Sequence, residues 1–408
     1  MSRPALEHAA LPHAAPARVL ALGAFLKNRA CLVMGDEVVW SPLHGDLGTA
    51  AACAALAESA AALLAIAEHR CGPAPGAAPV DAIAHDLHPD FFSTRLALET
   101  AARLGVPALA VQHHHAHLAV VQAEQGGHGA GQGPWVGLAL DGVGLGTDGT
   151  AWGGEVLCLR GAECTRVGHL PALALPGGDV AAREPWRLVA AVLHAAGRAA
   201  QIDPQLAPRV GTALAGGVAT MLARDLNCPS TTSAGRWFDA AAGALGISTR
   251  QAEEAEAAQA LEAEASAWMQ SIGPARAAAL RDATPGTLDL VPLVASLLAE
   301  AGSADDRGRG AARFHLALAG GLVAAVASAA AAAGTRDVAL GGGCFFNRLL
   351  SGEIERGLLA RGLRPFRPGR VSVGDAGLAL GQAWAAGLRL RATHERTTAP
   401  EPAHAEEN

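Results

Sequence analysis

The 408-residue sequence has no tyrosine, and Lys27 is its only lysine, so arginine supplies nearly all of the positive charge. Its seven cysteines include no CxxC pair, which argues against a zinc ribbon or a disulfide framework and favours a reducing cytosol. The net charge is −7, and no long basic run occurs. Because nucleic-acid binding needs clustered basic residues, this charge argues against a nucleic acid as the main partner.

The sequence also has little that would direct it to a membrane. Residues 1–17 lack the apolar core of a signal peptide. Residues 315–334 are apolar, but they are mostly Ala and Gly, with Arg on both sides, so we expect a buried core helix there. The expected location is the cytoplasm, with no membrane partner.

What is present indicates a globular α/β protein. Half of the residues are hydrophobic and 17% are charged, and the length suits two lobes better than one core. Each half opens with strands around a tight turn and continues with alternating helices and strands, which predicts a duplicated α/β fold. The first half is expected to contain strands at 19–25, 31–34, 38–41, 80–84 and 108–111 and helices at 50–69, 92–104 and 113–122.

The second half is expected to begin after the Gly-rich residues 125–134. We expect a hairpin of strands 136–140 and 150–159, a mostly helical region at 183–300, and strands at 337–340 and 371–373. Helices should start at Phe345 and Ala376. The predicted domains are a flexible arm (1–17), a first lobe (18–134), a second lobe with a helical insertion (135–390) and a disordered tail (391–408).

Residues 112–117, Gln-His-His-His-Ala-His, form the strongest candidate for a metal site. On a helix, His113 and His117 would share one face, one turn apart, as in many two-histidine metal sites. A single histidine is more often a solvated or core residue, but four in five positions favour metal. Asp141 and Asp375, each expected at the end of a strand, are natural additional ligands, although either alone could be a cap or turn residue. Such a set suits zinc or iron.

Two glycine-rich segments are candidate nucleotide loops. Residues 141–150 carry Gly142, Gly144 and Gly146, whose backbone N–H groups could hold a phosphate. The run from Gly341 through Gly342 to Gly343 separates a strand from a helix, so a nucleotide could lie at the helix N-terminus. Asn347 could bond base or ribose there. Cys344 is interpreted as a buried apolar residue rather than a nucleophile.

Taken together, the motifs resemble the C-terminal domain of HypF-type carbamoyltransferases, which is similar to TsaD-type proteins of the actin-like ASKHA fold. The resemblance covers nearly the whole chain. It is carried by Leu20-Ala21-Leu22-Gly23 with Leu26-Lys27-Asn28, Ala84-His85-Asp86-Leu87-His88-Pro89-Asp90 with Ser93-Thr94-Arg95, residues 111–117, Leu140-Asp141-Gly142, Trp152-Gly153-Gly154-Glu155, Leu175-Pro176-Gly177-Gly178-Asp179, Arg183-Glu184-Pro185-Trp186-Arg187, Thr232-Ser233-Ala234-Gly235-Arg236, Phe238-Asp239-Ala240, the Gly341–Gly343 loop, and Asp375 with Gly377-Leu378-Ala379-Leu380-Gly381-Gln382.

The resemblance implies an actin-like fold of two duplicated lobes with a nucleotide and metal cleft between them. It implies metal ligands His113, His117, Asp141 and Asp375, with His113, His117, Asp141 and Lys27 as catalytic residues. It implies contacts of ATP, AMP or carbamoyl adenylate with residues 142–146, Asp239 (ribose hydroxyls), Glu254, Gly341–Gly343 and Asn347. Where the family tends to have Glu-Gly-Gln, this chain has Glu254-Ala255-Glu256.

The resemblance further implies transfer of a carbamoyl group from carbamoyl adenylate to the C-terminal Cys thiolate of HypE, for the cyanide ligand of [NiFe]-hydrogenase. The acylphosphatase-like, zinc-finger and YrdC-like domains of full-length HypF are missing here, so we expect a separate YrdC-like protein to supply the adenylate.

Three other functions remain open. They are O-carbamoyl transfer to a small molecule, binding of HypE or nucleotide without turnover, and tRNA modification of TsaD type. The last would call for His-x-Glu-Gly-His at residues 113–117, and a sugar or acetate kinase of this fold would not need the histidines.

Overall fold

The computed structural model describes residues 4–72, 78–125 and 133–398. The chain forms two compact units. The first comprises Met1–Gly133, Leu159–Cys164 and Pro368–Asn408, and the second comprises Pro134–Cys158 and Thr165–Arg367. The first unit therefore takes in residues after 367 that the sequence analysis assigned to the second lobe. Most of the Gly-rich boundary expected at 125–134 lies outside the described residues.

A mixed six-stranded sheet forms the centre of the first unit, in the order β1-β4-β3-β2-β5-β6. Its strands β1 to β4 pair antiparallel, whereas β2, β5 and β6 run parallel to one another. Strand β1 lies within the stretch expected to be a flexible arm, so that prediction is corrected for its residues. The strands are β1 (Glu7–Ala10), β2 (Val19–Ala21), β3 (Cys31–Met34), β4 (Glu37–Trp40), β5 (Ala82–Asp86) and β6 (Ala108–Val111).

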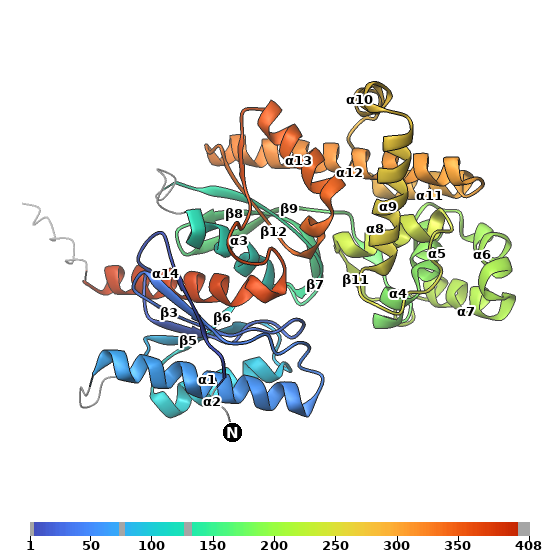
Figure 1. Ribbon diagram of the computed structural model, residues 1–408. Helices are drawn as coiled ribbons and strands as arrows, with labels where there is room; N and C mark the ends of the chain where they lie inside the picture. The colour runs from blue at the N-terminus through green and yellow to red at the C-terminus, as the bar shows by residue number, and fades with distance from the viewer. Residues whose placement is uncertain (1–3, 73–77, 126–132, 399–408) are drawn as a thin grey trace, which may run out of the picture. The chain divides into compact units, whose positions relative to one another are not determined.

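Helices cover both faces of this sheet (Figure 1). Helices α1 (Ala50–Cys71) and α2 (Phe92–Leu104) enclose one apolar core, and α3 (His113–Gln125) and α14 (Leu378–Thr398) enclose the other. Helix α2 ends as predicted at Gly105, which has a left-handed backbone (φ 67°) that glycine adopts without steric cost. The three expected helices of this half are thus confirmed.

The segment that leads into α14 differs from the prediction. Residues 371–373 do not form a strand, because the Glu124 carboxylate accepts the backbone N–H groups of Gly369, Arg370 and Val371. A 3-10 turn, η4 (Asp375–Gly377), then starts the helical region expected at Ala376. Helix α14 continues to Thr398, well into the tail that was expected to be disordered from 391; residues 399–408 lie outside the described residues.

The sheet of the second unit has the order β10-β11-β8-β7-β12-β13, with β9 paired to β8. Its run β9-β8-β7-β12-β13 repeats the run β4-β3-β2-β5-β6 of the first unit, since in each the hairpin strands come first and two parallel neighbours follow. This repetition confirms the predicted duplication. The strands are β7 (Trp135–Leu145), β8 (Ala151–Arg160), β9 (Glu163–His169), β10 (Leu173–Ala174), β11 (Ser230–Thr231), β12 (Asp337–Gly341) and β13 (Arg364–Phe366).

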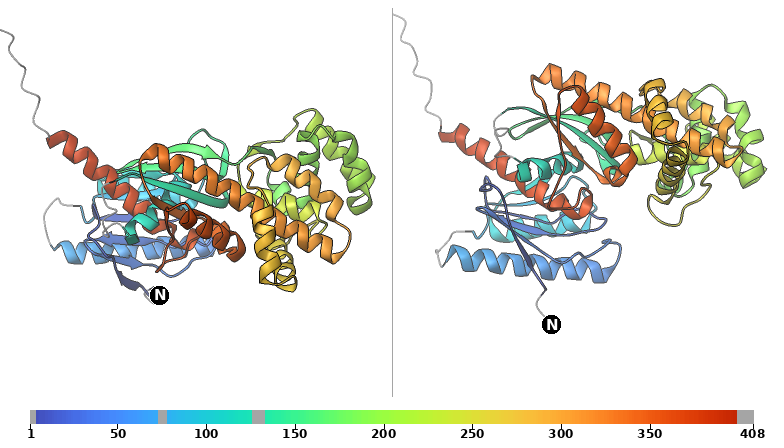
Figure 2. Two further views of the ribbon diagram at one scale, coloured as in Figure 1. Left: turned by 90° about the horizontal axis from the view of Figure 1, so that it is seen from above. Right: turned by 45° about the horizontal axis from the view of Figure 1, so that its top comes forward.

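The rest of the second unit is mostly helical, as expected for residues 183–300 (Figure 2). Its long helix α12 starts with a Ser303–Asp306 capping box and ends at left-handed Gly334. The helices are α4 (Asp179–Arg183), α5 (Pro185–Ala195), α6 (Ile202–Val210), α7 (Thr212–Ala223), α8 (Ala234–Ala244), α9 (Glu256–Ser271), α10 (Pro274–Ala283), α11 (Leu290–Leu297), α12 (Ala304–Ala333) and α13 (Arg348–Ala360), with 3-10 turns η1 (Ala199–Gln201), η2 (Leu298–Glu300) and η3 (Gly343–Phe346).

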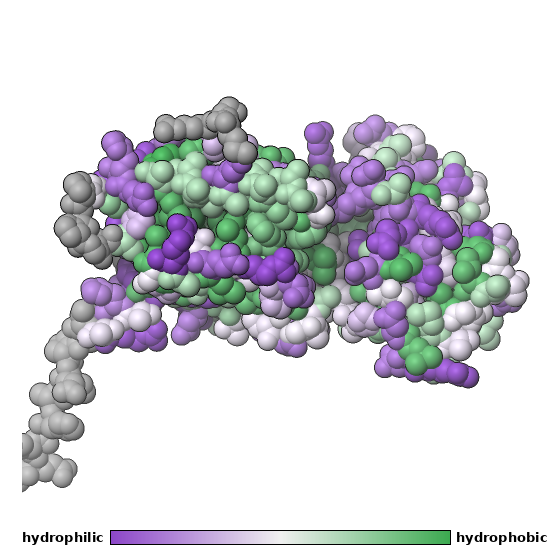
Figure 3. All heavy atoms as spheres, turned by 90° about the horizontal axis from the view of Figure 1, so that it is seen from below, coloured by the Kyte–Doolittle hydropathy of each residue, from purple (hydrophilic) through white to green (hydrophobic). Residues whose placement is uncertain are grey.

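Two helices, α1 and α12, are long and apolar enough to cross a membrane by length and composition alone. In α12, half of the most apolar window is buried within the protein, as in a core helix. The outer side of α1 is rich in alanine, and Figure 3 shows hydrophobic residues gathered where this helix lies. Its exposed alanines are Ala50, Ala51, Ala54, Ala61 and Ala65.

Gly381 permits the close contact between α14 and α3. A Cβ atom at Gly381 would overlap the carbonyl of Ala116 and would lie 3.0 Å from Cγ2 of Val120. We predict that Gly381→Ala lowers the free energy of unfolding by about 1–3 kcal/mol, the usual cost of overpacking a core. Urea denaturation followed by circular dichroism measures this change.

The matched control is Gly352→Ala in α13, where an added Cβ meets nothing within 4 Å. This control should raise the free energy of unfolding by about 0.5–1 kcal/mol, because alanine favours the helix over glycine. Equal stability of the Gly381→Ala variant and the unaltered chain would contradict the close contact.

Candidate metal and nucleotide sites

Three side chains that could bind a metal ion lie close together in the first unit. His113 and His117 lie one turn apart at the start of α3, with their Nε2 atoms 3.2 Å from each other. The Oδ1 atom of Asp375, in η4, lies 3.5 Å from Nε2 of His113 and 3.4 Å from Nε2 of His117. Both imidazoles are buried, and the Asp375 side chain is 15% exposed. The predicted i, i+4 pair and one predicted carboxylate therefore converge within one unit.

The spacing of these three atoms fits one tetrahedral ion. Ligand atoms about 2.0–2.1 Å from a four-coordinate metal lie roughly 3.3–3.4 Å from one another. The three observed separations bracket that value. Two imidazoles and a carboxylate are also ligands that zinc and iron accept, so the donor set fits the expected divalent ion.

Asp86, the last residue of β5, orients His113. Its Oδ2 atom lies 2.9 Å from His113 Nδ1, and its Oδ1 accepts the backbone N–H of His88. Because a carboxylate accepts, Nδ1 of His113 is the donor and its Nε2 lone pair faces His117 and Asp375. This is the carboxylate–histidine arrangement that supports metal ligands. The sequence shows only an acidic residue at the end of an apolar run, and the pairing of β5 with β6, which leads into the histidine run, brings it beside His113.

The other two histidines of the run are buried and contribute differently. The Nδ1 atom of His114 lies 2.9 Å from the Gln112 side-chain amide, whose Oε1 accepts the His115 N–H. Burial, together with the charge of Arg389, lowers the pKa of His115 to about 3. His115 is therefore neutral at physiological pH, and no hydrogen-bond partner of its ring lies within the described residues.

Asp141 belongs to the second unit and lies inside β7 rather than at its end. The strand was expected to stop at residue 140, but it continues to Leu145. Gly142 and Gly144 are therefore strand residues, and the turn runs from Gly146, whose N–H donates to the carbonyl of Thr150. Asp141 is buried, and its Oδ1 accepts the N–H groups of Gly142 and Gly343.

The Gly341–Gly343 segment follows β12 directly, as predicted. Strand β12 runs parallel to β7, and this register brings Gly343 beside Asp141. Gly342 has a φ of 102°, and a Cβ atom there would overlap the carbonyl of Leu140, so only glycine fits. The following helix does not start at Phe345: residues 343–346 form η3, and α13 starts at Arg348.

The side chain of Asn347 forms two hydrogen bonds within the protein. Its Oδ1 caps α13 by accepting the Leu350 N–H, and its Nδ2 lies 2.9 Å from Nε2 of His315. His315 Nδ1 donates to the carbonyl of Ala311, so Nε2 is the acceptor. Nucleotide contact by Asn347 stays a prediction. In the structure this side chain caps α13 and contacts His315.

Asp239 and Glu254, the expected ribose contacts, also lie in the second unit. Asp239 is fully buried in α8, and burial raises the pKa of its carboxyl group, although Arg236 Nη2 lies 2.7 Å from Oδ2. The Oδ2 atom is therefore already paired with Arg236, and a ligand hydroxyl group would share the carboxylate with that guanidinium. The Glu254 carboxylate lies near Gly142.

Ala255 stands where the family tends to have glycine and has a left-handed backbone with φ of 64°. The altered residue therefore keeps the conformation that glycine adopts more readily. The next residue, Glu256, accepts the backbone N–H of Ala252 with Oε2.

Two further predictions concern Cys344 and Lys27. Cys344 is half-buried rather than buried as predicted. Desolvation, followed by the charge of Asp141, raises the pKa of its thiol well above the usual value, so this residue is unsuited to act as a thiolate nucleophile. Lys27 is exposed in the turn after β2, and its N–H donates to Asp46. The buried Gln382 of α14 accepts the Gly23 N–H and holds that turn.

We predict that Asp86→Asn weakens divalent-metal binding by about 10–100-fold, because the neutral amide no longer orients and polarises His113. Competition with a chromogenic chelator measures this affinity. The control is Asp36→Asn, which removes an equal charge from an exposed turn and should change the affinity by no more than about twofold. Equal affinities of the Asp86→Asn variant and the unaltered chain would refute the orienting role.

Two family models match the chain. Residues 14–124 match the HypF Kae1-like domain, and residues 137–382 match the second subdomain of the carbamoyltransferase Kae1-like domain. A carbamoyltransferase HypF homolog of Cupriavidus necator is 55% identical, with 91% of each chain covered. Carbamoyltransferase HypF2 of the same organism is 47% identical over 90% of this chain but only 46% of its own length.

Solved structures agree with these matches. The crystal structure of T. kodakarensis HypF superposes with a TM-score of 0.77 at 31% identity, covering 94% of this chain and 49% of that one. Full-length HypF in a phosphate- and nucleotide-bound form superposes with a TM-score of 0.76 at 25% identity, covering 93% and 47%. This chain thus spans about half the length of these longer relatives. With its two Kae1-like regions, its duplicated α/β fold and its histidine pair, the chain belongs to the family of HypF carbamoyltransferases.

Proposed function

We propose that this protein transfers a carbamoyl group from carbamoyl adenylate to the C-terminal Cys thiolate of HypE. The observation that carries the proposal is the convergence of His113, His117 and Asp375, backed by Asp86, in a chain whose relatives are named carbamoyltransferase HypF. HypE as the acceptor rests on the sequence resemblance. Supply of the adenylate by a separate YrdC-like protein is part of the same proposal.

The metal would be held by His113, His117 and Asp375, with Asp141 as the fourth ligand. The position of Asp141 beside Gly343 supports this assignment, because the same carboxylate would then link the ion to the glycine segment. When bound, a divalent ion supplies a Lewis acid for the carbamoyl carbonyl oxygen or the phosphate oxygens of the adenylate. Its identity, zinc or iron, is left to metal analysis.

The residues of the second unit would bind and orient the adenylate. The buried Asp239 carboxylate would accept hydrogen bonds from the ribose hydroxyls beside its ion pair with Arg236. Backbone N–H groups near Gly144 and Gly342 would hold the phosphate. Glu254, close to Gly142, and Lys27 of the first unit are the remaining proposed contacts.

The nucleophile in this proposal comes from the acceptor. Cys344 is unsuited because its thiol is held protonated. The acceptor thiolate attacks the carbamoyl carbon, a C–S bond forms, and the C–O bond to the adenylate phosphate breaks. The electron pair of that bond leaves with AMP, so no oxidant or reductant is needed.

An in-trans transfer assay tests the proposal. Metal-loaded protein is mixed with HypE and separately prepared carbamoyl adenylate, and the intact mass of HypE is followed. We predict a carbamoyl mass gain on the C-terminal Cys, and a rate at least about 100-fold lower for His113→Ala, because a lost ligand should cost more than a lost supporting residue.

The matched control is His194→Ala, which removes an exposed histidine of α5 and should transfer at the unaltered rate. No mass gain by a chain that binds metal and nucleotide would exclude HypE as acceptor. Transfer to a small-molecule hydroxyl would then point to O-carbamoyl transfer, and no transfer to either would point to a binding role.

A further inference from the structure

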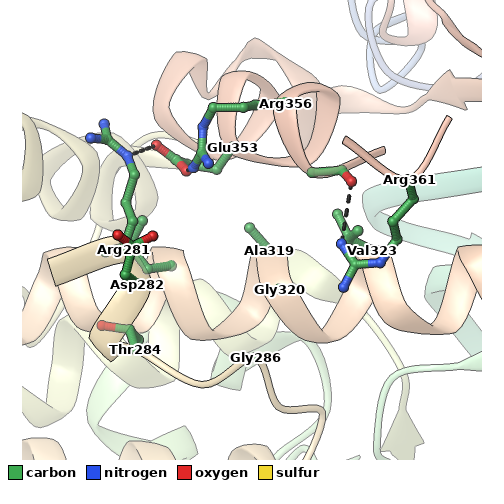
Figure 4. Close-up of a pocket in the computed structure, with 12 residues that line it drawn as sticks. Arg281, Asp282, Thr284, Gly286, Ala319, Gly320, Val323, Glu353, Arg356 and Arg361 are labelled. Carbon is green, nitrogen blue, oxygen red and sulfur yellow. Dashed lines mark hydrogen bonds and ion pairs between the residues drawn. The ribbon is translucent and has the colours of Figure 1, made fainter. Parts of the chain in front are cut away.

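A cavity of about 370 Å³ lies in the second unit, and its lining includes none of the candidate metal or nucleotide residues. Its floor is formed by Ala319, Gly320 and Val323 of α12, and α10 and α13 supply its walls (Figure 4). At this floor the backbone of α12 lies close to the backbone at Gly286: a Cβ atom at Gly320 would lie 2.7 Å from Cα of Gly286. The volume is within the range of small-molecule sites, roughly 300–1,000 Å³.

The polar side chains stand at two ends of this cavity (Figure 4). At one end, Glu353 is buried between two guanidinium groups: Arg281 Nε donates to its Oε1 over 2.7 Å, and Arg356 pairs with its Oε2. Asp282 lies beside them. This end has two cations and two carboxylates, so it offers both hydrogen-bond donors and acceptors with no net charge.

The other end carries one arginine, whose side chain is exposed. Arg361, at the C-terminal end of α13, donates through Nη1 to the carbonyl of Gly357 over 3.2 Å. Within the described residues it forms no ion pair with a carboxylate. An arginine near a helix C-terminus is favourable in itself, but one carbonyl uses only part of its five-donor fork.

We infer that this cavity binds a phosphorylated small molecule that carries hydroxyl groups. The phosphoryl group pairs with Arg361, the body of the ligand covers Ala319 and Gly320, and its hydroxyls bond the carboxylates and guanidiniums at the opposite end. A phosphoryl group suits Arg361 because its several oxygens match the guanidinium fork. A hydroxylated body suits the other end because hydroxyls both donate and accept.

This site is separate from the nucleotide residues. Asn347 caps the first turn of α13, whereas Arg361 follows the last residue of that helix. At 1.5 Å per residue, the two positions lie about 20 Å apart along the helix. Occupation of one site therefore leaves the other accessible.

Calorimetric titration of the full chain with ribose 5-phosphate in low salt tests the inference. We expect one site, with Arg361→Gln weakening binding at least about tenfold because charge-assisted hydrogen bonds are strong. Asp282→Asn should also weaken binding. The control, Arg276→Gln, removes the same charge from an exposed position on α10 outside the cavity and should leave the affinity within about twofold.

Two further probes separate the parts of the ligand. Inorganic phosphate should bind more weakly than ribose 5-phosphate, and ribose alone should not bind measurably. No binding of ribose 5-phosphate, equal losses in Arg361→Gln and Arg276→Gln, or equally tight binding of ribose would each overturn the inference.

Discussion

The close contact of α14 with α3 is the constraint on which the candidate metal site depends. Gly381 lies against the Ala116 carbonyl, in the same turn region that carries His113 and His117. Because Gly381 has no Cβ, α14 packs close to α3. The preceding η4 turn then places Oδ1 of Asp375 3.5 Å from Nε2 of His113 and 3.4 Å from Nε2 of His117, about the distance between two ligands of one tetrahedral ion. Two segments far apart in the sequence thus supply one set of ligands through backbone packing.

Both units use a fixed histidine tautomer to position a neighbouring group. In the first unit, the Asp86 carboxylate accepts from His113 Nδ1 and leaves Nε2 as the acceptor. In the second unit, the Ala311 carbonyl accepts from His315 Nδ1, and Nε2 faces the amide of Asn347. Burial lowers the pKa of His315 to about 4, so this ring stays neutral at physiological pH and keeps its acceptor. The tautomer at each position follows from the partner of the other ring nitrogen.

The sequence could predict those features that local pattern determines. The spacing of His113 and His117 indicated a shared helix face, and strands β6 and β12 were expected nearly where they occur. It could not show that Glu124 would take the N–H groups of residues 369–371, because that carboxylate is distant in sequence, and a strand was wrongly expected there. The length of β7 was underestimated because glycines 142 and 144 suggested a turn, although they lie within the strand.

Anomalous diffraction from crystals of the zinc-loaded chain tests the central claim most directly. The account predicts one strong peak within about 2.0–2.2 Å of the Nε2 atoms of His113 and His117 and of an Asp375 oxygen, as for four-coordinate zinc, with Asp141 as the fourth ligand. A fully loaded protein whose peak lies elsewhere, or whose zinc is bound by cysteine, would contradict it.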